Sequence, residues 1–453
     1  MPVQSAFHPV TATTTDSGVA AKLGPLLASV LGTDRIGSEL PVRFEFWDGT
    51  TFGSASSGDV VHIRSARALR WLMWAPNDLG LGRAFVSGDI DITGDLYAAI
   101  DAFRSRTAAN QKFSPGQVAA TVVAAARLGV IGRPLTPPPE EARVTRWQRH
   151  SKAHDAGAIS HHYDVGNDFY RLVLGPAMTY SCARFPDGST DLVAAQASKH
   201  DLICRKLGLH ERPNPRLLDV GCGWGSMAIH AAVYHGARVV GITISDEQAK
   251  RARERVAEAG VGDLVEIRLL DYRDLRGENF DAISSVGMSE HVGSERIDEY
   301  FGILRSVLRP EGRLLNHAIS SVGGSRLGKR SFTYRYVFPD GELLDVSDTC
   351  RAMQRAGFEV RDVESLREHY ALTLRAWVAN LEAQWDTAVA LVGLPRAKVW
   401  KLYMAASAMG FEEGGLSLHQ VLGVVADQVG SVAMPPTRDS WTTSGLFPGQ
   451  GSS

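Results

Sequence analysis

The sequence LLDVGCGWGS, residues 217–226, reads as a buried strand, a glycine loop and the first residue of a helix. Gly221 and Gly223 allow the backbone to turn tightly and to approach a ligand closely. The free N–H groups at the start of the following helix favour a carboxylate or a phosphate. A glycine triplet alone is weak support for a cofactor site, but this one follows the first clear strand of an alternating run.

Strands and helices alternate from residue 216 onward. The helix at 245–260 has Ser245 as its expected N-cap and Gly260 as its stop. This alternation predicts an α/β fold with a mostly parallel, doubly wound, Rossmann-like sheet. The expected strands are RLLDV (216–220), ARVVGITI (237–244), LVEIRLLD (264–271), FDAISSVG (280–287) and GRLLNHAIS (312–320). Residues 340–450 are predicted to be largely helical and to add a C-terminal layer.

The N-terminal part predicts a smaller unit. Residues 1–20 are rich in Thr, Ser and Ala and are expected to be mobile. Residues 21–130 suggest an α+β domain with strands within 41–49 and 59–65, a helix at 66–75 and a further helix at 114–130. Four large apolar side chains lie close in sequence, and a packed core explains them better than a lipid pocket does: Phe46, Trp47, Trp71 and Trp74.

Residues 131–154 have the composition of a linker before the α/β domain, which we place at 155–450. Its PPP run is stiff. Its second half places Arg143, Arg146, Arg149 and Lys152 beside Trp147. These residues are either a solvated face or an interfacial anchor for anionic lipid, and the sequence leaves both interpretations open.

Composition excludes several classes of protein. A chain of 453 residues with a net charge of −2 suggests two or three domains and no nucleic-acid partner. The four cysteines show no CxxC or Cys/His ladder, so we predict neither a metal site nor disulfides. We therefore expect a reducing compartment. The N-terminal residues lack a signal-peptide pattern, and no apolar run approaches the roughly 20 residues that cross a bilayer.

The glycine loop favours S-adenosylmethionine over a dinucleotide. A dinucleotide site prefers G-x-G-x-x-G and an acidic residue at the end of the next strand. Here the loop is one residue shorter and the next strand ends in GITIS. Asp219 immediately before GCGWG fits the S-adenosylmethionine loop of methyltransferases.

The chain resembles the cyclopropane-fatty-acid synthase family, which includes mycolic acid methyltransferases and the enzymes that begin tuberculostearic acid synthesis. The resemblance covers roughly residues 155–425, and the N-terminal unit resembles the lipid-binding domain of longer members. It rests on motifs in the family's order: HHYDVGNDFYRLVLGPAMTYSCARF (161–185), LLDVGCGWG (217–225), ITISDEQ (242–248), LDYRDL (270–275), MSEHVG (288–293), RLLNHAIS (313–320), RYVFPDGEL (335–343) and HYALTLRAW (369–377). Asp340 stands where many members have glycine.

The resemblance implies a class I methyltransferase fold and a set of cofactor contacts. Methionine, ribose and adenine of S-adenosylmethionine are expected to meet side chains and backbone from five segments. The residues are Tyr180, Ser181, Gly221, Gly223, Thr243, Ile244, Gln248, Asp271, Tyr272 and Val286.

The resemblance also implies a bicarbonate ion held beside the transferred methyl group. Its expected cage consists of Cys182, Glu290, His317, Ile319 through its backbone, and Tyr370. Each of these residues also has a plain structural explanation, such as packing or a local ion pair. Cys182 is expected to be a neutral wall of the cage, because a reactive thiolate facing a sulfonium would risk methylation.

The implied reaction is methyl transfer to the cis double bond of an oleoyl-type chain in membrane phospholipid. The resulting carbocation requires a dry pocket with aromatic faces and a base. Candidates for the aromatic wall, or simply for the core, are Tyr170, Phe332, Tyr334, Tyr336 and Phe411. The similarity favours a 10-methylene product over a cyclopropane ring, while a non-lipid substrate or a noncatalytic lipid carrier remains an alternative.

The same resemblance implies where the protein acts and with what. We expect a cytoplasmic enzyme at the inner face of an anionic membrane, a homodimer, and a downstream reductase.

Overall fold

The computed structural model describes residues 18–30, 42–54, 56–107, 123, 125–142, 165–186, 189–324, 327–339 and 341–442. The chain forms two compact units. One comprises Met1–Arg143, Lys329–Val337 and Gly393–Ala406, and the other comprises Val144–Gly328, Phe338–Val392 and Ser407–Ser453. Two segments from within the expected 155–450 domain therefore group with the N-terminal residues.

Some predictions fall outside the described residues. They concern the N-terminal segment up to residue 17, most of the helix expected at 114–130, the cationic linker residues Arg143, Arg146, Arg149 and Lys152 with Trp147, and Asp340. These stay predictions.

The first unit is built on a small mixed sheet in the order β2-β1-β3-β4. Strand β1 pairs in parallel with β3 and antiparallel with β2, and β3 pairs antiparallel with β4. Its strands are β1 (Arg43–Phe46), β2 (Thr51–Gly53), β3 (Val60–Ile63) and β4 (Ile90–Thr93); its helices are α1 (Val19–Val30), α2 (Ala66–Trp74), α3 (Asp78–Val86), α4 (Leu96–Thr107) and α13 (Phe332–Tyr336).

The aromatic residues of this unit mostly form its core. Phe46 and Trp71 are buried in one cluster, and the Trp71 indole N–H donates to Asp89 at 3.0 Å. Trp47 packs at the edge of this cluster, whereas Trp74 is 53% exposed. The packed-core interpretation is therefore confirmed for Phe46 and Trp71 and wrong for Trp74.

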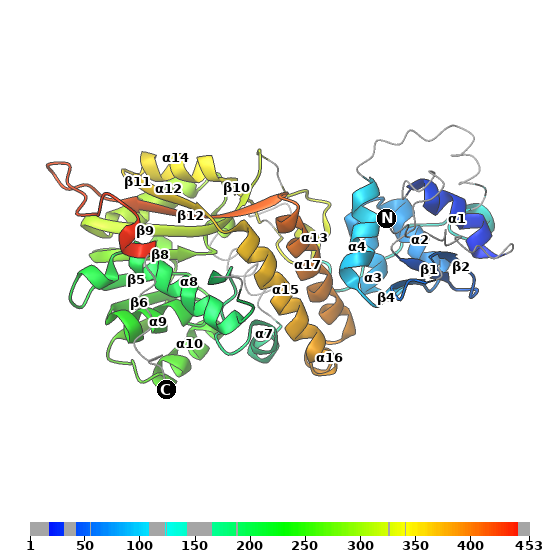
Figure 1. The fold of residues 1–453 in the computed structure, drawn as a ribbon, viewed down its shortest axis with the longest axis horizontal. Helices are drawn as coiled ribbons and strands as arrows, with labels where there is room; N and C mark the ends of the chain where they lie inside the picture. The colour runs from blue at the N-terminus through cyan, green and yellow to red at the C-terminus, as the bar shows by residue number, and fades with distance from the viewer. Residues whose placement is uncertain are drawn as a thin grey trace, which may run out of the picture. The chain divides into compact units, whose positions relative to one another are not determined.

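The second unit contains a large sheet in the order β11-β12-β9-β8-β5-β6-β7, with β10 paired to β9 (Figure 1). Neighbours from β9 to β7 are parallel, as predicted, and β12 runs antiparallel between β9 and β11. The strands are β5 (Arg216–Val220), β6 (Arg238–Thr243), β7 (Val265–Leu269), β8 (Phe280–Val286), β9 (Leu308–Ser321), β10 (Leu344–Asp345), β11 (Glu359–Ser365) and β12 (Leu416–Val424).

Helices cover both faces of this sheet, which confirms the doubly wound prediction. The two neighbouring residues Leu217 and Leu218 of β5 belong to two different core clusters, because successive side chains point to opposite faces. Helices α8, α9 and α10 pack on one face, and α12 and α14 pack on the other. Their bounds are α8 (Leu192–Lys206), α9 (Ser226–His235), α10 (Asp246–Glu258), α12 (Ile297–Ser306) and α14 (Val346–Arg355).

The remaining elements complete the C-terminal part. They are α7 (Asn167–Leu174), α11 (Ser289–Val292), α15 (Arg367–Ala383), α16 (Trp385–Val392), α17 (Leu394–Glu412), α18 (Asp439–Thr442), and the 3₁₀ turns η2 (Leu209–Glu211) and η3 (Tyr272–Asp274). The prediction of a largely helical layer at 340–450 is thus incomplete, since β11 and β12 extend the main sheet. In the described part of the chain, no helix is both long and apolar enough to span a membrane.

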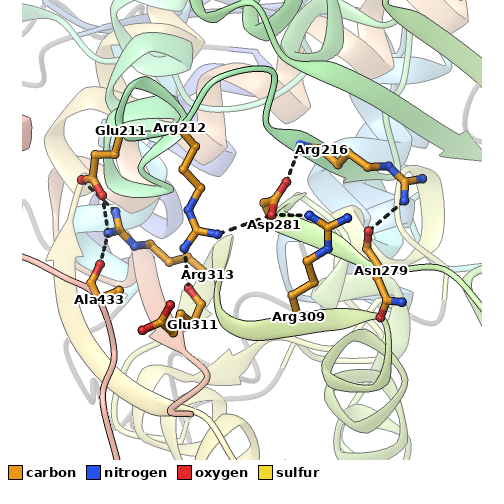
Figure 2. A network of polar contacts seen from close by, with 9 residues as sticks. All are labelled: Glu211, Arg212, Arg216, Asn279, Asp281, Arg309, Glu311, Arg313 and Ala433. Atoms are coloured by element: carbon orange, nitrogen blue, oxygen red, sulfur yellow. Dashed lines mark hydrogen bonds and ion pairs between the residues drawn. The ribbon is translucent and has the colours of Figure 1, made fainter.

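A polar network fixes the amino end of the main sheet (Figure 2). Asp281, the second residue of β8, accepts the backbone N–H of Arg216 at 2.8 Å and the Arg309 guanidinium at 2.8 Å. Nearby, the Arg313 guanidinium bonds to Glu211 at 2.6 Å and to the Ala433 carbonyl at 3.0 Å. The Asp281 contacts join the starts of β5, β8 and β9 at the edge opposite the glycine loop, and the Arg313 contacts connect β9 to η2 and to the segment after β12.

Asp281→Ala should lower the free energy of unfolding by about 1–3 kcal/mol, because the Arg216 N–H loses its acceptor in a half-buried place. Arg309→Ala is the matched control, and it should cost less than about 1 kcal/mol because that side chain is 44% exposed. Urea unfolding measures both values. Equal losses in the two variants would contradict the proposed importance of Asp281.

Candidate functional site

The carboxyl ends of β5, β6 and β8 lie at one edge of the sheet, because these strands are parallel. Loops leaving these strands form a pocket together with residues that follow β7 and with the segment before α8. This is where ligands bind in open α/β sheets. Residues 221–224 of the glycine loop line this pocket.

Gly221 is required in this loop on two counts. Its φ of +71° lies in the left-handed region, and a Cβ added there would be 2.4 Å from the Met288 sulfur. Its N–H and that of Cys222 both donate to the Ile242 carbonyl at 2.9 Å, which ties the loop to β6. Substituting Gly221 would therefore displace Met288 and the wall of the pocket that it forms.

All ten residues predicted to contact the cofactor line this one pocket: Tyr180, Ser181, Gly221, Gly223, Thr243, Ile244, Gln248, Asp271, Tyr272 and Val286. Thr243 and Gln248 are buried and bonded to each other at 2.9 Å. Ser245 caps α10 as predicted, by accepting the Gln248 N–H. Asp271 is held by a 2.6 Å ion pair with Arg273. The structure thus brings together the whole set, although its residues span more than 100 positions.

Two buried charged side chains also line the pocket. Lys199 is 1% exposed and donates to the Ser181 hydroxyl at 3.0 Å. Burial lowers the pKa of Lys199 to about 7, against the opposing effects of Cys182 and Asp219. Asp219 accepts the Ser284 hydroxyl at 2.7 Å, while its Oδ2 has no hydrogen-bond partner among the described residues. Burial raises the pKa of Asp219 to about 6.

Sequence analysis missed Lys199, because lysine is ordinarily exposed and ASKHD reads as a polar stretch. One signal was present. Ala195, Leu202 and Ile203 fall on the same helical face as Lys199, at spacings of three and four residues. A lysine within an apolar stripe marks a candidate site for a buried charge.

Glu290 reaches from α11 to β9. Strand β8 ends at Val286, which pairs with His317 of β9, so the β9 residues after His317 have no partner on β8. The Glu290 carboxylate takes the place of that partner and accepts the Ile319 N–H at 2.8 Å. The other oxygen of Glu290, Oε2, is buried without a hydrogen-bond partner among the described residues. Burial raises the pKa of Glu290 to about 7.

His317 lies two residues before Ile319 on the same strand. Gln420, its partner on β12, donates from its amide nitrogen to His317 Nδ1 at 3.3 Å, which leaves the ring proton on Nε2. In the described part of the chain this buried Nε2 has no hydrogen-bond partner. Burial, and then the charge of Lys199, lower the pKa of His317, so the ring is neutral.

Cys182 and Tyr370 meet at the start of α15. The Cys182 thiol and the Tyr370 N–H both donate to the Leu366 carbonyl, at 3.7 and 3.2 Å. Burial raises the pKa of Cys182, so the thiol is protonated and is not a nucleophile. The charge of Lys199, which lines the pocket, lowers the pKa of both Cys182 and His317.

Aromatic rings continue from the pocket toward Tyr370. Successive ring centroids along this series lie 4.9 to 6.1 Å apart: Trp224, Tyr170, Tyr180, Trp377 and Tyr370, with Phe411 a further 4.7 Å away. Tyr170 and Phe411, two predicted wall residues, belong to this series. The other three, Phe332, Tyr334 and Tyr336, are buried in α13 of the first unit, where Phe332 packs against Gly82.

The sheet order, the glycine loop and the pocket at the carboxyl edge define a class I S-adenosylmethionine-dependent methyltransferase fold. A similar solved structure is the mycolic acid cyclopropane synthase CmaA1 complexed with SAH and CTAB. It is 33% identical, with a TM-score of 0.56, and the match covers 59% of this chain and 98% of that one.

The family model described as mycolic acid cyclopropane synthetase matches residues 150–421, and the chain belongs to this family. A relative from Mycobacterium tuberculosis, named a probable fatty acid methyltransferase, is 45% identical over 90% of this chain and 97% of its own. The tuberculostearic acid methyltransferase UfaA1 of the same organism is 32% identical over 85% of this chain and 88% of its own.

Glu290→Gln should stabilise the protein increasingly as the pH rises. The folded state holds the Glu290 proton up to a pKa of about 7, against 4.5 for an exposed glutamate, so wild type loses stability as the pH rises through this interval. Glutamine keeps an acceptor for the Ile319 N–H and never ionises.

Thermal unfolding from pH 5 to pH 8.5 measures the effect. The advantage of Glu290→Gln should grow toward a limit of about 3 kcal/mol. The control is Glu299→Gln on α12, an exposed position that should show no such trend. A constant difference between Glu290→Gln and wild type would refute the burial of an ionisable carboxyl group.

Proposed function

We propose that this protein transfers a methyl group from S-adenosylmethionine to the cis double bond of an oleoyl-type acyl chain in membrane phospholipid, giving a 10-methylene-branched chain. The observation that carries this proposal is the combination of two features in one unit. A pocket assembles all ten residues expected for the cofactor, and the segment after β8 that lines it also carries Glu290.

The pocket suits both ends of S-adenosylmethionine, which when bound supplies an electrophilic methyl group. Gln248 and Asp271 would bind the ribose and adenine side. At the amino-acid end, Asp219 Oδ2 would accept from the ammonium group. In its ammonium form Lys199 can only donate, so its bond to Ser181 leaves the hydroxyl proton of Ser181 to donate to the carboxylate.

The predicted cage fits a bicarbonate ion on the basis of its unused polar atoms. Glu290 Oε2 and His317 Nε2 are buried with no hydrogen-bond partner in the described structure, which is costly unless a ligand pairs with them. Bound bicarbonate would supply a base for the final proton loss. Glu290 would accept its hydroxyl and neutral His317 would donate to an oxygen, while Cys182 and Tyr370 would complete the wall.

The Ile319 N–H already donates to Glu290, so this group orients the carboxylate. The backbone N–H of Ile319 therefore holds Glu290 Oε1, and Oε2 is left for the ligand. Ile319 then contributes indirectly, by orienting Glu290.

The aromatic series from Trp224 to Phe411 would exclude water and present π-faces to positive charge that develops on the acyl chain. These residues are packed edge to face or tilted, so their positions are fixed before substrate binds. Water exclusion matters because water would trap the cation as an alcohol.

The name of UfaA1 favours a methyl-branched product over a ring. In both outcomes the new methyl group loses a proton. Direct loss closes a cyclopropane ring, whereas a hydride shift that first moves the cation to the methyl-bearing carbon leads to a methylene branch. Both outcomes require the same base, so the cage does not discriminate between them. A reductase that hydrogenates the methylene branch would act next.

The proposed substrate requires contact with a membrane from its inner face. Arg143, Arg146 and Arg149 beside Trp147 remain our proposal for the anchor, and a homodimer remains our proposal for the assembly. Reversing these three charges should weaken binding to anionic vesicles.

The function is tested by incubating the protein with ¹³C-methyl S-adenosylmethionine and vesicles of oleoyl phospholipid. Mass spectrometry should show one added carbon per modified chain, and NMR should show exomethylene rather than ring protons. No added carbon would overturn the proposal, and ring protons would replace the methylene product with the cyclopropane.

Glu290→Gln should lower turnover by about 100-fold or more, because the base is no longer held. Cys182→Ser should retain most activity, since the hydroxyl replaces a protonated thiol. Glu299→Gln should match wild type. A methyltransferase for a small molecule would not need the cage, so nearly intact turnover in Glu290→Gln would favour that alternative.

Lys199 should make SAH binding depend on pH. The free protein loses the Lys199 proton near pH 7, and a carboxylate ligand favours the charged form, so affinity should fall about threefold to tenfold from pH 6.5 to pH 8.5. Burial keeps His200 and His317 neutral throughout this range. Asp219 and Glu290, with pKa values of about 6 and about 7, also titrate in or near it, and the variant Lys199→Met retains both carboxyl groups and so separates their effect from that of Lys199.

Calorimetry across this pH range measures the dependence. 5′-Methylthioadenosine, which lacks the carboxylate, is the control ligand and should show a flat profile. Lys199→Met should bind SAH more weakly and without the slope. A slope that persists in Lys199→Met would assign the proton to another group.

A further inference from the structure

Three side chains with metal-binding chemistry converge between α8 and α9. Cys204 comes from α8, His230 from the middle of α9 and His235 from its last residue. One ligand atom of each lies within 4.8 Å of the others. All three are largely buried, and none lines the cofactor pocket.

His230 points independently to a ligand. It is 6% exposed, and its Nε2 has no hydrogen-bond partner in the described part of the chain. A buried imidazole nitrogen that pairs with nothing is costly, and a metal ion would satisfy it.

His235 is already oriented as metal-binding histidines are. Its Nε2 lies 3.1 Å from Asp201 Oδ1, and the other oxygen of Asp201 bonds to Arg205 at 2.6 Å. A carboxylate bonded to one ring nitrogen fixes the ring and leaves the other nitrogen for a metal. Asp201 and Cys204 are three residues apart on α8 and therefore share a face.

We propose that Cys204, His230 and His235 form a binding site for a divalent transition metal, with Zn²⁺ as the best match to one thiolate and two imidazoles. Asp201 orients His235 from outside, and water completes a tetrahedral set. Binding converts the Cys204 thiol to a thiolate and releases its proton to solvent. The ion joins α8, which carries Lys199, to α9, which follows the glycine loop.

The proposal departs from the sequence prediction of no metal site. His230 and His235 have the H-x4-H spacing that occurs in zinc sites, but Cys204 lies far from them in sequence, and only the packing of two helices brings it to them. Figure 1 shows α8 and α9 side by side on one face of the sheet.

Titration of the metal-stripped full-length protein with Co²⁺ tests the site. The expected result is one ion per chain with a thiolate-to-cobalt charge-transfer band, which Zn²⁺ abolishes by displacement. Cys204→Ala should lose the band, and Asp201→Asn should bind about 10-fold to 100-fold more weakly. Cys350→Ala, a partly exposed thiol on α14, is the control and should keep the band.

SAH binding measured on the same samples shows whether each variant is folded, independently of the metal. If Cys204→Ala does not fold, His235→Gln serves as the second test and should also lose stoichiometric binding. Absence of the charge-transfer band in wild type, or an unchanged band in Cys204→Ala or His235→Gln, would overturn the proposal.

Discussion

Parallel pairing of β5 with β6 and β8 is the constraint on which the site depends. It brings the ends of three strands to one edge, so that loops distant in sequence form one pocket. At the opposite edge, Asp281 joins the starts of β5, β8 and β9. The polar groups at one end maintain the alignment, and the other end is left to bind a ligand.

Burial of ionisable groups gives the pocket its chemical character. Lys199, Asp219 and Glu290 all lie in a low-dielectric interior, and burial brings the pKa of each closer to neutrality. Such groups cost stability and are typical of a functional site; Lys199 and Asp219 line the pocket, and Glu290 lies on the segment after β8 that also contributes to its lining. Neutral His317 and protonated Cys182 add polar contacts without adding charge. This character is consistent with our proposal of a charged cofactor and an anionic base beside an apolar chain.

The sequence predicted what local pattern controls. The glycine loop, the parallel strands and the N-cap at Ser245 all depend on neighbouring residues, and the family motifs supplied the ten pocket positions. Long-range packing was not predictable. The antiparallel insertion of β12 depends on pairing with β9 about 100 residues away, and the burial of Lys199 depends on the face that α8 turns inward. Likewise, Cys204 and His230 meet only because two helices pack together.

The central claim is that the cofactor pocket and the Glu290–His317 pair act on the same reacting atoms. A crystal structure of the protein with SAH and bicarbonate tests this most directly. The account predicts that the SAH sulfur faces the bicarbonate, and that the ion bonds to Glu290 Oε2 and His317 Nε2. An SAH sulfur turned away from these atoms, or protein side chains filling the space between them, would contradict it.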